Sequence, residues 1–213
     1  MIFRQLDVLL GRKFARLATN AVVARPGLWR IFRGPIRGQF DRLAARWNTF
    51  RSEESFEPLR QAVDTLPAQP ARVLDLGTGT GLAAFELARR FSGAEVVGVD
   101  VSERMINEAR RTTPPELATR VTFERADAAA LPYGDGSFEL VSLVNMIPFF
   151  DELERVTGPG GHVVFSFSSG PETPIWVPPE RLRAELEPRG FAEFAEFHAD
   201  GGTAFLARKQ SGG

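Results

Sequence analysis

Three closely spaced glycines are the first residues in this chain whose pattern suggests chemistry. Gly77, Gly79 and Gly81 follow the apolar run 71–76 and precede the helix-forming stretch 82–91. Glycine allows a tight turn and a close approach of the backbone to a ligand, because it has no Cβ. A helix that begins beside such a loop also offers unpaired amides to a ligand. The loop therefore predicts a cofactor site at the end of a buried strand.

Aspartates follow or end the apolar runs around this loop. Asp75 lies two residues before Gly77, Asp100 ends a Val-rich run, and Asp127 follows another. The loop also fits the Gly-x-Gly-x-x-Ala form of a dinucleotide fingerprint. A carboxylate at Asp75 disfavours a pyrophosphate, because like charges repel at short range. It suits a cationic ligand, or it accepts hydrogen bonds from the loop. A nicotinamide cofactor therefore stays the disfavoured alternative.

These residues resemble motif I of the class I S-adenosylmethionine-dependent methyltransferases. Residues 131–141 (LPYGDGSFELV) are similar to a stretch of the small-molecule, type 11 branch, and residues 154–161 (ERVTGPGG) to the turn before its fifth strand. The resemblance covers about residues 71–168 well. It implies S-adenosylmethionine as the cofactor, S-adenosylhomocysteine as the product, and a small molecule as the methyl acceptor.

The resemblance also assigns roles to single residues. It implies that Asp100 holds the ribose hydroxyls, and that Asp127 and the next backbone group meet the adenine. The full set of expected cofactor-binding residues is Asp75, Gly77, Thr78, Gly79, Gly81, Asp100, Val101, Asp127, Ala128, Val144 and Asn145.

The segment after residue 144 departs from the family pattern. Related enzymes often carry a His pair there, whereas this chain has Phe149 and Phe150. The departure argues against a mechanism that needs a histidine at this place, and it predicts an apolar floor for the acceptor pocket. The residues expected to line the acceptor pocket are Phe40, Trp47, Met146, Phe149, Phe150 and Trp176.

Few side chains qualify as a general base. His198, at the end of the expected strand 191–198, is a candidate, but an exposed histidine beside a turn is the favoured interpretation. Trp176 either covers the acceptor or packs on the N-terminal segment. The methyl group of a sulfonium is already activated, so positioning alone supplies much of the rate. We therefore assign no catalytic base, and we expect no metal site in a chain without cysteine.

From residue 71 onward, strand-like apolar runs alternate with helical stretches. The expected strands are 71–76, 95–100, 121–125, 138–144, 162–168, 191–198 and 203–207, and the expected helices between them are 82–91, 102–111, 151–156 and 179–187. Repeated strand–helix units predict an α/β fold with right-handed crossovers. We expect a doubly wound, mainly parallel seven-stranded sheet that closes with a hairpin, a Rossmann-like methyltransferase domain at 71–210.

Residues 1–66 are expected to form a basic helical arm that serves as a lid. Residues 1–51 hold eleven basic and two acidic residues, whereas residues 52–213 hold fifteen basic and twenty-five acidic ones. Pro26-Gly27 and Gly34-Pro35 are expected to interrupt its helices. Phe40 and Trp47 lie in a segment that resembles the lid of related enzymes.

The first helix of the arm has two interpretations. At about 100° per residue, one narrow stripe holds Phe3, Leu6, Leu10, Phe14, Leu17 and Ala21. In the favoured interpretation this stripe packs on the body or on a second copy in a homodimer, and the arginines pair with acidic surface. In the other, residues 3–21 lie on an anionic membrane surface.

Composition limits the remaining classes. The chain has no apolar run of about 18 residues that would span a bilayer, and Arg12, Lys13 and Arg16 interrupt any export signal. We expect a cytoplasmic protein, peripheral to the membrane if the arm binds lipid. A non-catalytic S-adenosylmethionine-binding module, associated with a membrane or partner through the arm, stays the alternative function. No nucleic-acid partner is expected, because Asn145-Met146-Ile147-Pro148 lacks the adjacent proline of base methylases.

Overall fold

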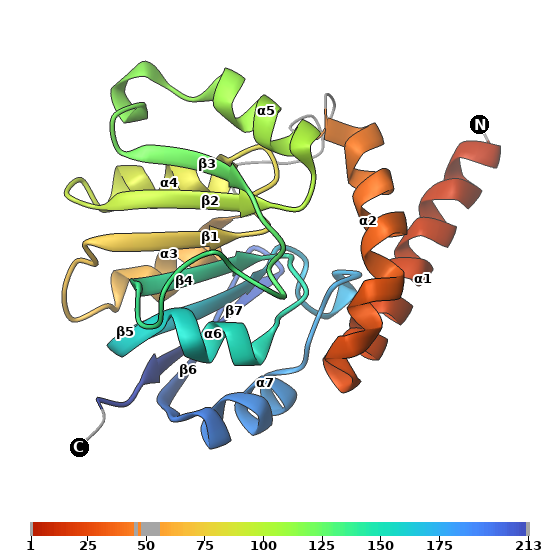
Figure 1. Ribbon diagram of the computed structural model, residues 1–213. Coiled ribbons are helices and arrows are strands. Elements are labelled where there is room, and N and C mark those ends of the chain that lie inside the picture. The colour runs from red at the N-terminus through yellow and green to blue at the C-terminus, as the bar shows by residue number, and fades with distance from the viewer. Residues whose placement is uncertain (1, 45–46, 48–55, 212–213) are drawn as a thin grey trace.

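Seven strands form one sheet in the order β3-β2-β1-β4-β5-β7-β6 (Figure 1). The computed structural model describes residues 2–44, 47 and 56–211, with side chains from residue 11 onward. The strands are β1 (Arg72–Leu76), β2 (Glu95–Asp100), β3 (Val121–Arg125), β4 (Phe138–Val144), β5 (Thr157–Phe167), β6 (Phe191–Ala199) and β7 (Gly202–Lys209). β7 pairs antiparallel with β5 and β6, and the other pairs are parallel. The predicted doubly wound sheet with a closing hairpin is confirmed.

Helices cover both faces of this sheet. The first face carries α3 (Glu57–Asp64), α4 (Leu82–Arg90) and α5 (Glu103–Thr112), and the second carries α6 (Phe150–Val156) and α7 (Pro179–Leu186). Short 3-10 helices occur at Pro26–Leu28, Pro115–Leu117, Gly170–Glu172 and Glu187–Arg189. Val73 belongs to the first core and Leu74 to the second, because successive strand residues point to opposite faces. The uninterrupted apolar runs of the sequence therefore fill two cores.

β5 begins earlier than the sequence predicts. Pro159-Gly160-Gly161 is expected to be a turn, but it lies inside the strand, which starts at Thr157. Thr157 pairs with Phe138, and the register with β4 shifts after this pair. Gly160 has a φ of +75°. Glycine at positive φ bends the strand into a bulge without ending it.

The arm begins with two helices, α1 (Ile2–Ala24) and α2 (Trp29–Leu43). They lie together at one side of the sheet, with α2 between α1 and the strand ends (Figure 1). The predicted interruption at Pro26-Gly27 is confirmed, but α2 continues through Gly34-Pro35. Proline removes one helical hydrogen bond, to the carbonyl of Ile31. The break is tolerated because Gly34 and Pro35 are exposed, where water can bind that carbonyl.

The face of α1 that packs on the rest of the protein is not centred on its apolar stripe. Ala18, Thr19 and Val22 are completely buried, whereas Leu17, a member of the stripe, is 61% exposed. Phe14 is half-buried against Phe32 of α2, with ring centroids 5.9 Å apart. The side chains of Phe3, Leu6 and Leu10 lie outside the described part of the chain. The stripe thus flanks the packed face, because the small residues beside it allow a closer approach.

Two arginines of α1 join the arm to the body. Arg12 donates to the carbonyl oxygen of Glu172 at 2.7 Å. Arg16 donates to the carbonyl oxygens of Pro171 and Thr173 at 2.7 and 2.8 Å. These partners are backbone groups, not the acidic side chains that the favoured interpretation of the sequence expects. No helix in the described part of the chain is long and apolar enough to cross a bilayer.

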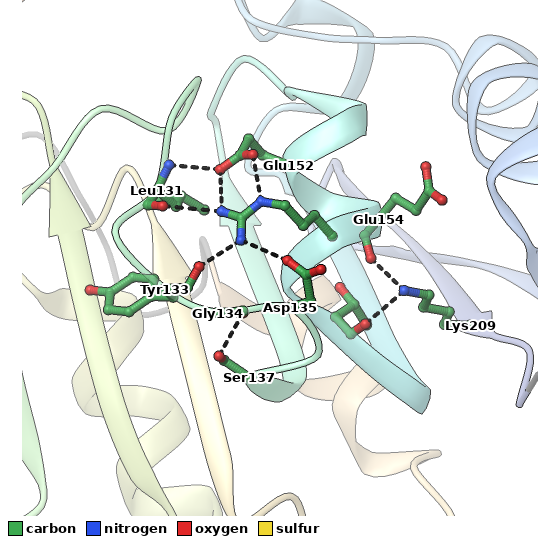
Figure 2. A network of polar contacts seen from close by, with 10 residues as sticks. Leu131, Tyr133, Gly134, Asp135, Ser137, Glu152, Glu154 and Lys209 are labelled. Atoms are coloured by element: carbon green, nitrogen blue, oxygen red, sulfur yellow. Dashed lines mark hydrogen bonds and ion pairs between the residues drawn. The ribbon is translucent and has the colours of Figure 1, made fainter.

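A single guanidinium fixes the loop before β4 onto α6. Arg155 donates to the carbonyl oxygens of Leu131 and Tyr133 at 3.1 and 2.6 Å, and it pairs with Glu152 at 2.8 Å. Glu152 also accepts from the Leu131 amide at 2.6 Å. Figure 2 shows Leu131, Tyr133, Asp135 and Glu152 gathered around this charge. Arg155 thereby lowers the pKa of the Glu152 carboxyl and keeps both groups ionised.

We expect Arg155→Met to lower the free energy of unfolding by about 2 kcal/mol, because it leaves two part-buried carbonyls and a carboxylate without their donor. Urea denaturation at neutral pH measures this. Arg181→Met is the matched control, since Arg181 forms one i,i+4 pair with Glu185 on the surface. The control should cost about 0.3–0.5 kcal/mol. Equal losses in both variants would contradict a structural role for the Arg155 network.

Candidate functional site

The loop between β1 and α4 turns on its glycines. Gly77, Gly79 and Gly81 have φ angles of +68°, +55° and +87°, in the left-handed region that other residues rarely adopt. A Cβ on Gly77 would lie 2.6 Å from the Met146 sulfur, and one on Gly81 would lie 2.7 Å from the Phe123 ring. The loop is therefore packed too closely for any side chain at these two positions.

Asp100 ties this loop to the start of α5. Its carboxylate accepts from the Gly79 amide at 3.1 Å and from the Ser102 amide at 2.8 Å. Burial raises the pKa of Asp100 from 3.8 to about 6, and the two amides and the Val101 amide oppose that rise. Asp41 of α2 adds a further upward push through charge repulsion. A half-buried carboxylate of this kind is a ready acceptor for hydroxyl donors.

The arm contacts the neighbourhood of Asp100 through α2. The Ser102 hydroxyl donates to the Asp41 carboxylate. The same hydroxyl accepts from the Met105 amide at 3.1 Å, as the N-cap of α5. Ser102 thus caps the helix that the sequence places at 102–111, and it also serves as an anchor for the arm.

A second contact of the arm is made to Asp127. Trp29 donates its indole N–H to Asp127 Oδ1 at 2.7 Å, and Arg33 donates to Oδ2 at 2.7 Å. The Ala129 amide also donates to Oδ1, at 3.1 Å. The Trp29 side chain packs edge-on against Phe149, with centroids 5.3 Å apart. The carboxylate that the resemblance assigns to adenine therefore binds the arm in this structure.

Asn145, directly after β4, has a strained backbone held by side-chain hydrogen bonds. Its φ is +51°, which is uncommon for a residue other than glycine. Its Oδ1 accepts from the Ser168 amide at 3.0 Å, and its Nδ2 donates to the Ser168 hydroxyl at 3.0 Å. These bonds join the carboxyl ends of β4 and β5. Strain of this kind often occurs at functional sites.

A cavity lies between the carboxyl ends of the strands and the arm. Most of the described residues around it are apolar or glycine, and Asp100 is the one carboxylate among them. The expected site residues that line it are Phe40, Trp47, Gly77, Thr78, Gly79, Asp100, Val101, Ala128, Val144, Asn145 and Met146. Phe40 and Trp47 contact each other edge-on, with centroids 5.3 Å apart. The structure thus brings the glycine loop, the strand ends and the arm together around one space.

Three expected cofactor residues lie just outside the lining. Asp75 is 1% exposed at the end of β1. Gly81 caps the N-terminus of α4, and Asp127 faces Trp29 and Arg33. Asp75 and Gly81 therefore adjoin the part of the loop that lines the cavity without lining it themselves.

Four expected acceptor or catalytic residues also lie elsewhere. Phe149 and Phe150 are buried in the core, because they start α6 and pack with its inner face. They form no floor of this cavity among its described lining residues. Trp176 borders a separate groove against the end of α1, as in the interpretation that packs it on the arm. His198 is exposed on β6 and outside the cavity lining.

The sequence analysis missed several cavity residues of the arm and of the loop after β5. Trp29, Ile36 and Ile175 line the cavity. Trp29, Ile36 and Phe40 are seven and four residues apart, which places them on one face of a helix. Treating Gly34-Pro35 as a helix break concealed this pattern.

Comparisons with known proteins agree with this geometry. A family profile described as a methyltransferase domain matches residues 73–161. The chain is 38% identical over 152 residues to the malonyl-[acyl-carrier protein] O-methyltransferase of Halorhodospira halophila, covering 67% of this chain and 50% of that protein. It is 38% identical over 159 residues to the demethylmenaquinone methyltransferase of Beutenbergia cavernae, covering 69% of this chain and 62% of that protein. It is 32% identical over 169 residues to the magnesium-protoporphyrin O-methyltransferase of Rhodobacter capsulatus, covering 70% of this chain and 74% of that protein.

The lengths differ, so the likeness is partial. The chain spans half to about three-fifths of the first two of these relatives. An S-adenosylmethionine-dependent methyltransferase structure from Aquifex aeolicus superposes with a TM-score of 0.63 at 17% identity, covering 78% of this chain and 97% of that one. A methyltransferase in complex with the Trm112 activator of Haloferax volcanii superposes with a TM-score of 0.64 at 19% identity, covering 80% of this chain and 97% of that one. These two structures show the fold. The fold, the glycine loop and the relatives agree: the chain belongs to the S-adenosylmethionine-dependent methyltransferases.

Proposed function

We propose that this protein transfers the methyl group of S-adenosylmethionine to a small lipophilic or aromatic acceptor. The observation that carries the proposal is the cavity itself, where a bare glycine backbone and one half-buried carboxylate face mainly apolar side chains. Small-molecule sites commonly combine apolar walls with a few fixed polar groups.

The residues present fit the cofactor. Asp100 lines the cavity with a carboxylate that has room for hydroxyl donors beside its two amide partners. Gly77, Thr78 and Gly79 line the cavity beside it, and Asn145 is held at its edge by Ser168. In this assignment Asp100 accepts from the ribose, and the loop backbone contacts the rest of the molecule. The cofactor supplies an activated methyl group.

The contribution of the protein to the reaction is mainly orientation. The described lining holds no histidine, lysine, tyrosine or cysteine, and Asp100 is assigned to the ribose. Holding two reactants in a productive geometry is worth up to roughly 7–11 kcal/mol. The aromatic pair Phe40 and Trp47 excludes water on the side of the arm.

The acceptor class follows from the walls of the cavity. Trp29, Ile36, Phe40, Met146, Ile147 and Ile175 all contribute apolar surface. Two relatives are named for a quinone precursor and a porphyrin, which are also flat and largely apolar. A lipophilic ring would bury its faces against these side chains, at about 25 cal/mol for each Å² removed from water.

Calorimetric titration with S-adenosylmethionine and S-adenosylhomocysteine tests the cofactor assignment. We expect both to bind, and Gly77→Ala to weaken binding at least tenfold, about 1.4 kcal/mol, because its Cβ would collide with Met146. Gly93→Ala is the control, since nothing lies within 4 Å of that Cβ.

Transfer of a radiolabelled methyl group to lipophilic phenols and quinols, against polar amines, tests the acceptor class. Absence of binding by the wild type at millimolar ligand would refute the proposed function.

The raised pKa of Asp100 predicts a pH dependence of cofactor binding. Hydroxyl donors stabilise the carboxylate, so binding lowers the pKa of Asp100 from about 6 and becomes linked to proton release below that pH. The dissociation constant of S-adenosylhomocysteine should stay constant above pH 7 and rise up to about tenfold per pH unit below 6. Asp100→Asn should bind more weakly at pH 7.5 and lose this slope, whereas Glu116→Gln, an exposed acid, should keep it. A slope that persists in Asp100→Asn assigns the titration to another group.

The contacts to Asp127 support a gating role for the arm. Trp29 and Arg33 hold the carboxylate that adenine is expected to approach. Entry of the cofactor therefore competes with these hydrogen bonds, and the arm acts as a lid that opens first.

We expect Trp29→Phe to raise the association rate constant of S-adenosylhomocysteine about tenfold, the equivalent of roughly 1.5 kcal/mol for one lost hydrogen bond to a carboxylate. Phenylalanine keeps the packing on Phe149 but has no N–H donor. Stopped-flow fluorescence measures the rate, and Trp176→Phe, outside the cavity, is the control. An unchanged rate in Trp29→Phe would show that the arm does not gate entry.

A further inference from the structure

The outward side of the arm combines exposed apolar and basic residues. Leu17 of α1 and Ile31 of α2 are 61% and 67% exposed, and they are the large apolar side chains with the greatest exposure among the described residues. Ile31 lies on the opposite side of α2 from the buried residues Trp29 and Ile36. Isolated exposed apolar residues are common, so their surroundings decide what they mean.

Those surroundings are strongly basic. Lys13 lies one helical turn before Leu17, and Arg30 adjoins Ile31. Lys13, Arg30 and Arg37 are exposed and form no ion pair with a described residue. Arg25 and Arg42 share this property, whereas three other arginines of the arm have partners in the body. Arg12, Arg16 and Arg33 each bind a group of the body.

No acid offsets these cations. Between residues 11 and 44 the single acidic residue is Asp41, and its carboxylate accepts a hydrogen bond from Ser102 of the body. The outer face thus carries positive charge with no neutralising partner among the described side chains. We define the outer arm face as Lys13, Leu17, Arg30, Ile31 and Arg37.

Leu17 and Ile31 lie at the same level of the two helices. Phe14 of α1 contacts Phe32 of α2, and Leu17 and Ile31 are within one turn of these two rings. Figure 1 shows both helices at the same outer side of the molecule. The inner side of α2 lines the cavity through Trp29, Ile36 and Phe40. α2 therefore carries part of the cavity wall and part of the outer arm face.

We propose that the outer arm face docks on an anionic lipid bilayer. Lys13, Arg30 and Arg37 would meet the lipid phosphates, and Leu17 and Ile31 would enter the boundary of the acyl chains. Charge selects this occupant. A second copy of the chain would place one basic face against another, whereas anionic lipid supplies the complementary charge over a wide area.

The proposal does not rest on methyl transfer, but it has a consequence for it. With the outer arm face on a membrane, the cavity lies just behind the helix that touches the lipid. A lipophilic acceptor dissolved in the bilayer would then reach the cavity through the arm without crossing water.

Vesicle co-sedimentation of the full chain tests the proposal. The probes are vesicles of phosphatidylcholine alone and vesicles of phosphatidylcholine mixed with phosphatidylglycerol. We expect binding to the mixed vesicles only, and a loss on the order of fivefold in partitioning for each cation removed in Arg30→Gln/Arg37→Gln. Leu17→Ser/Ile31→Ser should also bind less, although it keeps every charge. The matched control is Arg89→Gln/Arg183→Gln, which removes two exposed cations from α4 and α7.

The outcomes separate the alternatives. Equal losses in the arm variant and in the control would mean that net charge, not this face, drives binding. Absence of binding to mixed vesicles would overturn the proposal. A dimer in light scattering that Leu17→Ser/Ile31→Ser dissociates would overturn it in favour of a second copy. Circular dichroism confirms that the variants fold, which the exposure of all four arm positions leads us to expect. Cofactor binding, measured separately, tells a failure of this proposal from a failure of the proposed function.

Discussion

A half-buried carboxylate at the end of β2 is the interaction on which the site depends. Asp100 receives amides from the glycine loop and from the start of α5, so it sets the distance between two elements that the sheet alone leaves free. Burying a charge without partners is costly, and the raised pKa shows that the two amides only partly compensate. The remaining acceptor capacity is directed at the cavity. The same group thus shapes the site and leaves it incomplete without a ligand.

The arm follows from the same constraint. Parallel strands end at one edge, and their loops expose polar groups together with apolar side chains there. The arm covers this edge with an apolar helix face and satisfies Asp127 with Trp29 and Arg33. Ala18, Val22, Trp29 and Ile36 of the arm also belong to the core of the second face. Apolar packing and the hydrogen bonds to Asp127 and Ser102 therefore hold the arm in place together.

The sheet was predictable from the sequence because its signals are local. Apolar runs, glycines after a strand and the Ser102 cap each act within a few residues, and the strand order follows from the repeated crossovers. The start of β5 could not be predicted from the sequence, because Thr157 pairs with Phe138, a partner nineteen residues away in the chain. The pattern also predicted Gly77, Thr78 and Gly79 in the cavity lining, but it included Gly81 and omitted Thr80, which lines the cavity. The role of Trp29 did not follow from the pattern, since its hydrogen bond spans ninety-eight residues and no local spacing reports it. From the sequence alone, Phe149 and Phe150 could belong either to the floor of the cavity or to the hydrophobic core. Only the packing of α6 on β5 decides that they belong to the core.

The attachment of α1 to the body has a consequence for how this protein can diversify. Arg12 and Arg16 bind the carbonyl oxygens of Pro171, Glu172 and Thr173, which every amino acid supplies. Substitutions in that loop can therefore change its side chains without releasing the helix, provided that the backbone keeps its path. The next residues of the same segment include Ile175, which lines the cavity. Substitutions can thus vary this wall of the cavity while the backbone contacts that hold the arm stay the same.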